Sequence, residues 1–583
     1  MSLYGNTSSL ITKKAAVCSE QPIATKIGLE ILEKGGNASD AAIATFVAVS
    51  ILAPSTSGIG GDIQCLFYRK SDNSIQQING SGKTGLHTTL ENVQNAGIHH
   101  SSETKYSQEG LWVSIPGAVE GMFNVLRHFG SGKLSMSDIL QPVIKLAEEG
   151  VTIAPKTAGV WNKASRAFIE SKNKDDFLIN GKPPQAGDVI TAPKLAKCLK
   201  EIASKGAEAF YCGPIAERIV SEVKNSGGSL TLDDFKEYHA NPPSKAPSQP
   251  ISIDFQGFTI WEMKPNTTGI VVLVALNVLK KFDLKSLGHN TAEYIHIVAE
   301  VIKISYTECW DYICDPDHTT SSFQNLLSET TANKLCKKID ERRASKPEVS
   351  FEGGSTTYLA VVDEEGNGFN FLRLVTVLPI RITLRSQGTR ALLQDFCRSN
   401  GFIDNTSHLS SFLFQNRLKC MSLIQNSPNV YGPRKLPLHT IIPGMVTDSR
   451  TGELLAVFGV MGLWMQPQGH IQVLLNMIIF GMDPQTALSQ PRFFVGDSNR
   501  FAADYKQSFS LICLEDGINP AAISTLQSKG HQCKIVKDID RLMFGKGSVI
   551  ARPKLFNKDL HGDAQNTWWS GVDPRSDSFP AGI

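Results

Sequence analysis

Several features that would give this chain a simple assignment are missing. Its 583 residues carry a formal net charge of only +2, so no charge excess predicts binding to nucleic acid or to an acidic partner. The longest apolar stretches, residues 41–53 and 270–279, are shorter than the roughly 20 residues that a helix needs to cross a bilayer. Residues 1–14 are polar and lack the apolar core of a signal peptide. We therefore expect a soluble, cytoplasmic protein without a membrane segment.

The eleven cysteines are an odd number and show no regular spacing. The nearest pair, Cys309 and Cys314, has no cluster of histidines beside it. This pattern fits neither a disulfide framework nor a zinc site. We expect most of the cysteines to be buried thiols, and we expect no metal and no cofactor.

The composition is that of a globular protein with a large core, 41% hydrophobic and 20% charged. Length alone suggests roughly three to four domain-sized units, with the Pro-rich residues 241–250 as a candidate linker. The hydrophobic patterns predict an α/β (α+β) chain with strands flanked by helices, consistent with a layered sandwich. The expected helices cover residues 23–34, 40–52, 120–129, 136–149, 207–226, 266–281, 291–312 and 470–480, with one more starting near 231, and the expected strands cover 17–19, 63–68, 75–79, 251–262 and 454–460.

The helix predicted at 40–52 is apolar on nearly every face, so it should lie in the core. Ser39 is a suitable N-cap for it. The loop that follows, residues 55–62, is rich in glycine and serine. Such a loop can bring backbone N–H groups close to an anion or an oxyanion, but it lacks the Lys-Ser/Thr ending of a P-loop. A tight turn is the alternative interpretation.

The stretch 353–363 is where we place the chemistry. Two glycines precede Thr356 and Thr357, and a β-rich run follows that ends in a turn at 363–367. If the bond between Ser355 and Thr356 were cut, Thr356 would gain an α-amino group with a pKa of about 7.7–8.0. That amine can accept the proton of its own residue's hydroxyl, which makes the hydroxyl a nucleophile. An ordinary strand start after a Gly-rich loop remains the alternative.

Further segments follow one another in a distinctive order. They are residues 29–32, 35–42, 57–61, 113–121, 227–231, 292–296, 356–357, 361–363, 366–367, 481–484, 491–493 and 573–575. Together they resemble the γ-glutamyltransferase (γ-glutamyltranspeptidase) family of N-terminal-nucleophile hydrolases, and the resemblance covers nearly the entire chain.

The resemblance implies a four-layer αββα sandwich made from a precursor that cuts itself. Residues 1–355 would form the large portion and residues 356–583 the small portion, and the two would stay associated. Thr356 would be the nucleophile, and the backbone N–H groups of Gly462 and Leu463 would hold the oxyanion. The implied substrates are γ-glutamyl amides such as glutathione, with water or an amino-acid or peptide as the acyl acceptor.

The implied amino-acid clamp departs from the family pattern. Ser81 stands where the family has an arginine for the substrate α-carboxylate, and Lys83 is two residues further on. Lys83 would supply a point charge without the two-pronged guanidinium. The run 415–420, which contains Asn416, has none of the acidic residues expected for the α-amino group. His439 and Thr440 replace a pair of serines near the oxyanion. We name Ser81, Lys83, Asn416, His439 and Thr440 as substrate-binding candidates.

Residues 372–413 also depart from the family pattern. The resemblance implies a Thr-x-Asn run after Asn367 that helps to hold the nucleophile, whereas here an Arg-, Leu- and Ser-rich insert follows. Thr376, within it, is a further substrate-binding candidate. The insert is either a fault in the inferred coding sequence or a lineage-specific loop. Two other functions stay open: an uncleaved, non-catalytic homologue, and an amidase of a non-glutamyl substrate.

Overall fold

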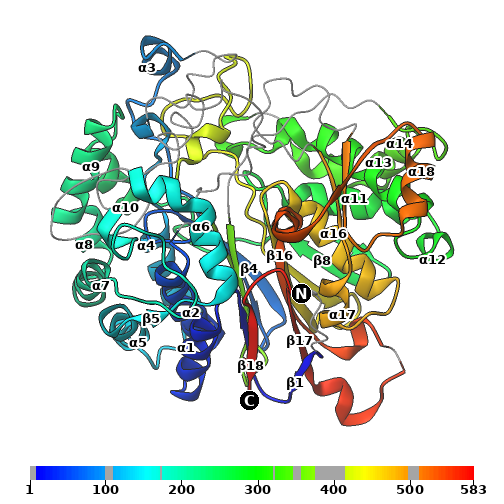
Figure 1. Ribbon diagram of the computed structural model, residues 1–583, viewed down its shortest axis with the longest axis horizontal. Helices are drawn as coiled ribbons and strands as arrows, with labels where there is room; N and C mark the ends of the chain where they lie inside the picture. The colour runs from blue at the N-terminus through cyan, green and yellow to red at the C-terminus, as the bar shows by residue number, and fades with distance from the viewer. Residues whose placement is uncertain are drawn as a thin grey trace.

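Two antiparallel sheets packed face to face form the centre of the computed structural model (Figure 1). The structure describes residues 8–54, 56–98, 109–170, 174–319, 322–345, 356–374, 414–496, 511–557 and 559–583. The seven-stranded sheet has the order β1 (Leu10–Thr12), β17 (Trp568–Val572), β16 (Lys546–Ala551), β12 (Leu454–Met461), β11 (Gly444–Asp448), β8 (Phe258–Glu262) and β7 (Ile251–Phe255). The six-stranded sheet has the order β18 (Phe579–Gly582), β2 (Ala16–Ser19), β9 (Thr356–Val362), β10 (Gly368–Leu374), β3 (Asp62–Arg69) and β4 (Ser74–Gly80).

Alternation along the strands produces two hydrophobic cores. In β9, Tyr358 and Ala360 belong to the core that includes residues of both sheets, whereas Leu359 and Val361 pack with the helices on the outer face. Successive side chains of a strand point to opposite faces, so one strand serves both cores. The outer helices of this sheet are α1 (Pro22–Glu33), α2 (Ala38–Leu52), α4 (Ala118–Phe129) and α5 (Met136–Glu149).

Helices α11 (Gly269–Leu279), α13 (Ala292–Cys309) and α16 (Met465–Ile478) cover the outer face of the seven-stranded sheet. In Figure 1 the two groups of helices lie on opposite sides of the paired sheets. The expected four-layer αββα sandwich is therefore confirmed. The two sheets approach closely where β9 faces β12. The ring of Tyr358 in β9 occupies the space that a Cβ on Gly459 of β12 would need.

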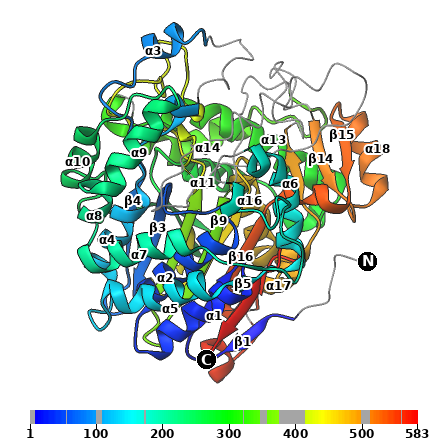
Figure 2. The same ribbon diagram turned by 60° about the vertical axis from the view of Figure 1, so that its left-hand side comes forward.

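Smaller elements surround this sandwich (Figure 2). They are the sheet β13 (Phe493–Val495), β14 (Leu511–Glu515) and β15 (Gln532–Val536), the pair β5 (Val151–Thr152) and β6 (Val189–Ile190), and the helices α3 (Leu90–Asn95), α6 (Pro155–Glu170), α7 (Pro193–Lys205), α8 (Glu208–Tyr211), α9 (Pro214–Asn225), α10 (Leu232–Ala240), α12 (Leu284–Leu287), α14 (Glu329–Cys336), α17 (Pro484–Ser489) and α18 (Pro520–Ser528). Within the described ranges, no helix combines the length and the apolarity that a bilayer crossing requires.

Several predicted boundaries are wrong. Helix α2 begins at Ala38, and its N-cap is Asn37, whose side-chain oxygen accepts from the backbone N–H of Asp40. The hydroxyl of Ser39, the expected cap, is buried without a partner. The helix expected at 207–226 is two helices, since Gly213 and Pro214 start a new one after α8.

Two other segments also differ from expectation. The strand expected at 251–262 is a hairpin, with Gln256 and Gly257 at positive φ between β7 and β8. The candidate linker 241–250 is not a domain boundary, because Ser248 exchanges two backbone hydrogen bonds with Gln77 of β4. All ten described cysteines are free thiols and six are buried, as expected.

Candidate active site

Thr356 is the first residue of β9, in the middle of the six-stranded sheet. It lies opposite Leu374 of β10, and Leu374 lies opposite Asp62 of β3. These three backbone positions therefore form one row across the sheet. Ser355, Thr376 and residues 375–413 of the insert lie outside the described residues.

A buried polar network holds the start of β9. The hydroxyl of Thr357 donates to Glu20 Oε1 at 2.9 Å, and Lys546 Nζ donates to Glu20 Oε2 at 3.0 Å. The hydroxyls of Thr357 and Thr56 are 3.2 Å apart. Glu20 is 3% exposed, so its charge is balanced by Lys546 inside the protein. Together these contacts fix the residue that follows Thr356.

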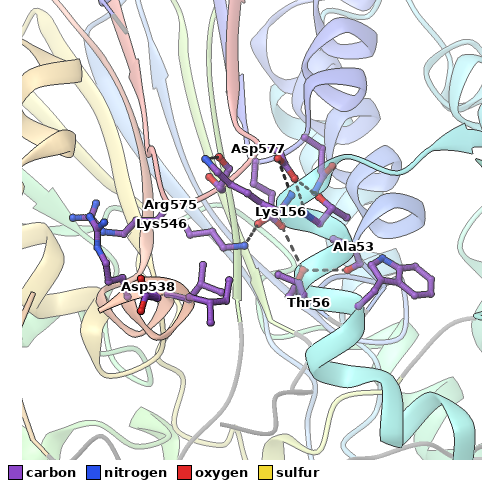
Figure 3. Close-up of a pocket in the computed structure, with 16 residues that line it drawn as sticks. Ala53, Thr56, Lys156, Asp538, Lys546, Arg575 and Asp577 are labelled. Carbon is purple, nitrogen blue, oxygen red and sulfur yellow. Dashed lines mark hydrogen bonds and ion pairs between the residues drawn. The ribbon is translucent and has the colours of Figure 1, made fainter. Parts of the chain in front are cut away.

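Figure 3 shows the cavity beside this network, with Thr56 and Ala53 on one side and Lys546 and Asp538 on the other. Its volume is about 50 Å³, which is room for a few water molecules and too little for an amide substrate. Lys156 points its ammonium at the carbonyls of Pro574 and Ser576, at 2.6 and 2.8 Å. This cavity is therefore too small to be the substrate pocket.

The turn after β12 approaches the same end of the sandwich. Met461 pairs with Lys546 of β16, and Gly462 and Leu463 follow with φ of 134° and 61°. Among the residues that the structure describes, no acceptor takes the backbone N–H of Gly462 or Leu463. The contacts run in sequence from the turn to Lys546, from Lys546 to Glu20, and from Glu20 to Thr357. They join the expected oxyanion turn to the expected nucleophile's strand.

The two candidates on the loop after β4 differ in their surroundings. Ser81 is fully buried, and its hydroxyl accepts from Gln64 Nε2 at 2.6 Å. Tyr238 donates to the Ser81 carbonyl at 2.8 Å. Ser81 is thus held by the protein itself. Lys83 is half-buried, and its carbonyl accepts from the backbone N–H of Ile115 at 3.0 Å.

His439 belongs to a buried pair that the sequence did not reveal. Its Nε2 lies 2.6 Å from Asp62 Oδ2, and both side chains are fully buried. Burial lowers the pKa of His439 to about 4, and the positive charge of Arg417 adds to this effect. The imidazole is therefore neutral near pH 7, and its Nε2 shares a hydrogen bond with Asp62. The hydroxyl of Thr440 is buried without a hydrogen-bond partner, and Asn416 is buried just before Arg417.

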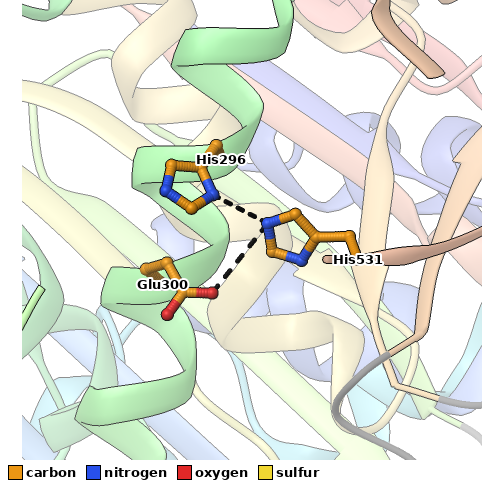
Figure 4. A group of neighbouring side chains, drawn as sticks. All are labelled: His296, Glu300 and His531. Atoms are coloured by element: carbon orange, nitrogen blue, oxygen red, sulfur yellow. Dashed lines mark hydrogen bonds and ion pairs between the residues drawn. The ribbon is translucent and has the colours of Figure 1, made fainter. Parts of the chain in front are cut away.

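A second cluster of titratable side chains lies between α13 and the start of β15 (Figure 4). His296 Nδ1 is 2.7 Å from His531 Nε2, and Glu300 Oε1 is 3.9 Å from the same nitrogen. These three side chains have the types and the proximity of metal ligands. However, Lys303 Nζ donates to Glu300 Oε1 at 2.7 Å, so an ammonium already neutralises the carboxylate that a cation would need. We assign this cluster to the core.

Comparisons with known proteins identify the family. The family model described as Gamma-glutamyltranspeptidase matches residues 24–583. The glutathione hydrolase-like YwrD proenzyme of Bacillus subtilis (strain 168) is 29% identical over 578 residues, covering 99% of each chain. The oxamate amidohydrolase proenzyme of Klebsiella pneumoniae subsp. pneumoniae is 27% identical over 583 residues, again covering 99% of each.

A solved structure agrees in fold over the same length. The cephalosporin acylase of Bacillus halodurans superimposes with a TM-score of 0.80 at 30% identity, covering 99% of this chain and 97% of that chain. By a family match that extends over most of its length, this chain belongs to the gamma-glutamyltranspeptidase family, which is a family of enzymes.

Proposed function

We propose that this protein is an acyltransferase and hydrolase of γ-glutamyl amides such as glutathione, with Thr356 as its N-terminal nucleophile. The observation that carries the proposal is the contact series that joins the start of β9, through Glu20 and Lys546, to the turn at Gly462 and Leu463. The relative named glutathione hydrolase-like proenzyme supports the substrate class and the processed form.

The chemistry follows from the new N-terminus. Cleavage between Ser355 and Thr356 leaves chains 1–355 and 356–583 and frees the α-amine of Thr356. The amine accepts the hydroxyl proton while Thr356 Oγ1 attacks the amide carbonyl, and it then passes the proton to the leaving amine. The N–H groups of Gly462 and Leu463 stabilise the oxyanion, each donor typically contributing about 2.7–4 kcal/mol. Water or an amino-acid acceptor then takes the acyl group.

A second candidate is an amidase of a non-glutamyl substrate. Ser81 is occupied by its own hydrogen bonds and supplies no guanidinium. The names of two similar proteins, an oxamate amidohydrolase and a cephalosporin acylase, refer to other amides. Both candidates share the cleavage and the nucleophile, so the acyl donor alone separates them. Cleavage of the purified protein into two fragments would exclude an uncleaved, non-catalytic homologue.

A Thr356→Ala variant tests the nucleophile. We expect the wild type to run as two fragments on a denaturing gel, with the smaller fragment beginning Thr-Thr-Tyr. Thr356→Ala should remain one chain of 63.6 kDa and should release no aniline from γ-glutamyl-p-nitroanilide. Thr356→Ser keeps a hydroxyl and an amine, so it should still mature, more slowly. Two fragments from Thr356→Ala, or an active wild type that is a single chain, would contradict the proposal.

A further inference from the structure

Arg417 is a buried cation that no carboxylate of the described residues pairs with. Its side chain is 1% exposed, and Nη1 donates only to Cys420 Sγ, at 3.5 Å. Within the part of the chain that the structure describes, Nε and Nη2 have no hydrogen-bond partner. Guanidinium does not lose its proton in proteins, and a buried charge without a partner strongly opposes folding. Such a residue needs an anion, and the described residues do not supply one.

The nearby carboxylate is already satisfied. Asp62 Oδ1 accepts from the backbone N–H of Gly82 at 2.7 Å, and Oδ2 accepts from His439 Nε2 at 2.6 Å. His439 is neutral, so it adds no positive charge, and Arg417 is the cationic group that acts on it. The unpartnered hydroxyl of Thr440 is next in the chain to His439. The neighbourhood thus offers hydrogen-bond donors, among them two guanidinium nitrogens that have no partner within the described residues.

This neighbourhood lies near the start of β9. Asp62 is two strands away from Thr356 in the same row, so their Cα atoms are roughly 10 Å apart at the usual strand spacing. Arg417 lies three residues after Phe414, and Phe414 forms an isolated β-bridge with Gly60, which comes just before β3. A short acyl chain attached to Thr356 and an arginine side chain can together span such a distance.

We propose that Arg417 binds a carboxylate on the acyl group of the donor, and that the site recognises this carboxylate without recognising an α-amino group. The inference rests on the proposed acyl-transfer function. The absence of an amine contact follows from two observations: residues 415–420 contain no acidic side chain, and both oxygens of Asp62 are engaged. The acyl donors are therefore monoamides of short dicarboxylic acids, with or without an α-amino group on the acyl part.

Binding of glutarate tests this site independently of catalysis. We expect glutarate, and not butyrate, to raise the melting temperature of the wild-type protein. Arg417→Met should abolish the glutarate effect. Arg434 on the same segment is exposed and pairs with Glu237. Arg434→Met therefore removes an equal charge and should retain the glutarate effect. Without ligand, Arg417→Met should melt at the same temperature or higher, because an unpaired buried charge has been removed.

Kinetics then test recognition in the acyl-transfer reaction. We expect glutaryl- and γ-glutamyl-p-nitroanilide to have kcat/KM values within about tenfold, and butyryl-p-nitroanilide to be slower. Arg417→Met should lower kcat/KM for glutaryl-p-nitroanilide by about 30-fold or more, as is usual when one partner of a buried charge pair is lost, and leave butyryl-p-nitroanilide within threefold. Arg417→Lys restores the charge without the two-pronged geometry and should recover only part of the activity.

The outcomes separate the two proposals. The inference is overturned if glutarate does not stabilise the wild type, if Arg417→Met keeps the glutarate effect, or if Lys83→Met abolishes it in place of Arg417→Met. A lower melting temperature for ligand-free Arg417→Met with an unchanged glutarate effect would show a structural cation and would also overturn it. An uncut wild type that binds glutarate through Arg417 would refute the proposed function and leave the carboxylate site standing.

Discussion

Leu463 is a bulky residue at a backbone position that favours glycine. Its φ is 61°, and a left-handed conformation costs an L-residue about 1–2 kcal/mol. Its side chain is nevertheless 3% exposed and belongs to the central core. Removing a buried leucine side chain typically destabilises a protein by about 2–5 kcal/mol. Packing therefore outweighs strain, and this explains how a leucine is accommodated in this turn.

A Leu463→Gly variant tests this balance. We expect a net loss of about 1–3 kcal/mol in stability, from the lost packing less the relieved strain, seen as a lower melting temperature. Because the backbone N–H groups stay in place, kcat/KM for a γ-glutamyl anilide should stay within about threefold. As a contrast, a Cβ at Gly462 would lie 2.9 Å from the Cα of Gly545, so Gly462→Ala should lose activity. A more stable Leu463→Gly would show that strain dominates.

Motif residues do not all serve chemistry. Arg492, Asp573 and Arg575 are among the residues that carry the family resemblance, yet they form a buried ion-pair network with Glu515. Arg492 Nη2 donates to Asp573 Oδ2 at 2.7 Å, and Arg575 Nη1 donates to Asp573 Oδ1 at 3.0 Å. Arg541 joins through Glu515 at 2.7 Å. These residues tie β13, β14 and the segment after β17 together.

Among the elements, α2 shows how a cap decides a boundary. The Asn37 side chain accepts from the N–H groups of Ser39 and Asp40, and Asp40 accepts from the N–H of Asn37. Asn37 Nδ2 also donates to the Phe129 carbonyl at 2.7 Å. The next N–H, that of Ala38, donates to Asp363 just after β9. The cap therefore sets where α2 meets the end of β9.

Paired substitutions distinguish the two possible caps. We expect Asn37→Ala to lower stability by about 1 kcal/mol, the usual loss when a capping side chain is removed. Ser39→Ala should be neutral or slightly stabilising, because its hydroxyl is already buried without a partner. Melting temperatures of the two purified variants decide this. A larger effect from Ser39→Ala would restore Ser39 as the functional cap.

How much the sequence predicts depends on where each element's signal resides. Helix α5 was predicted at its observed bounds because its periodicity and its stop at Gly150 are local. The start of α16 was missed because its first turns are polar. Gln468 and Gln472 are buried there, and they bond the backbone of Val495 and Phe493 in β13. That tertiary pairing leaves no local pattern.

The same distinction holds for the candidate site. Thr356 and the turn at Gly462 stand in segments that resemble the family, so the sequence points to both, although their roles remain proposals. The pair of Asp62 and His439 joins residues 377 positions apart, and no spacing rule brings them together. Arg417 was visible only as one member of a run without acidic residues. Its meaning depends on burial, which the sequence does not state.

The whole molecule is one composite sandwich. In the six-stranded sheet, β9 and β10 lie between β2 and β3, so strands from both sides of the proposed 355/356 cut are joined in one hydrogen-bonded sheet. The chain therefore does not form a series of separate domains, each with its own core, as its length alone had suggested. Cutting one bond before β9 would leave these ladders intact, and this supports the expectation that the two fragments stay associated.

At this scale stability should depend on pH through buried histidines, His439 and His531 in particular. Burial lowers the pKa of His439 to about 4 and that of His531 to about 3, against about 6.5 in an unfolded chain. Between these values the unfolded state binds more protons, so the stabilisation is complete above pH 6.5 and is lost as the pH falls. His470 adds little between about pH 5 and 6, because burial also raises the pKa of its partner Glu262. In that range the folded pair holds one proton on Glu262, and the unfolded pair holds one on the histidine.

Melting curves between pH 7 and pH 5 measure this effect. Each of the two histidines should lose roughly 2 kcal/mol of stabilisation by pH 5. Carboxylates with lowered pKa values, such as Asp483, act only below this range. Burial also lowers the pKa of His289 and of His296, so His531→Gln removes one of several titrating groups and should reduce the slope without abolishing it. A wild type equally stable at pH 5 and pH 7 would mean that both imidazoles are already charged, or hydrated, in the folded protein.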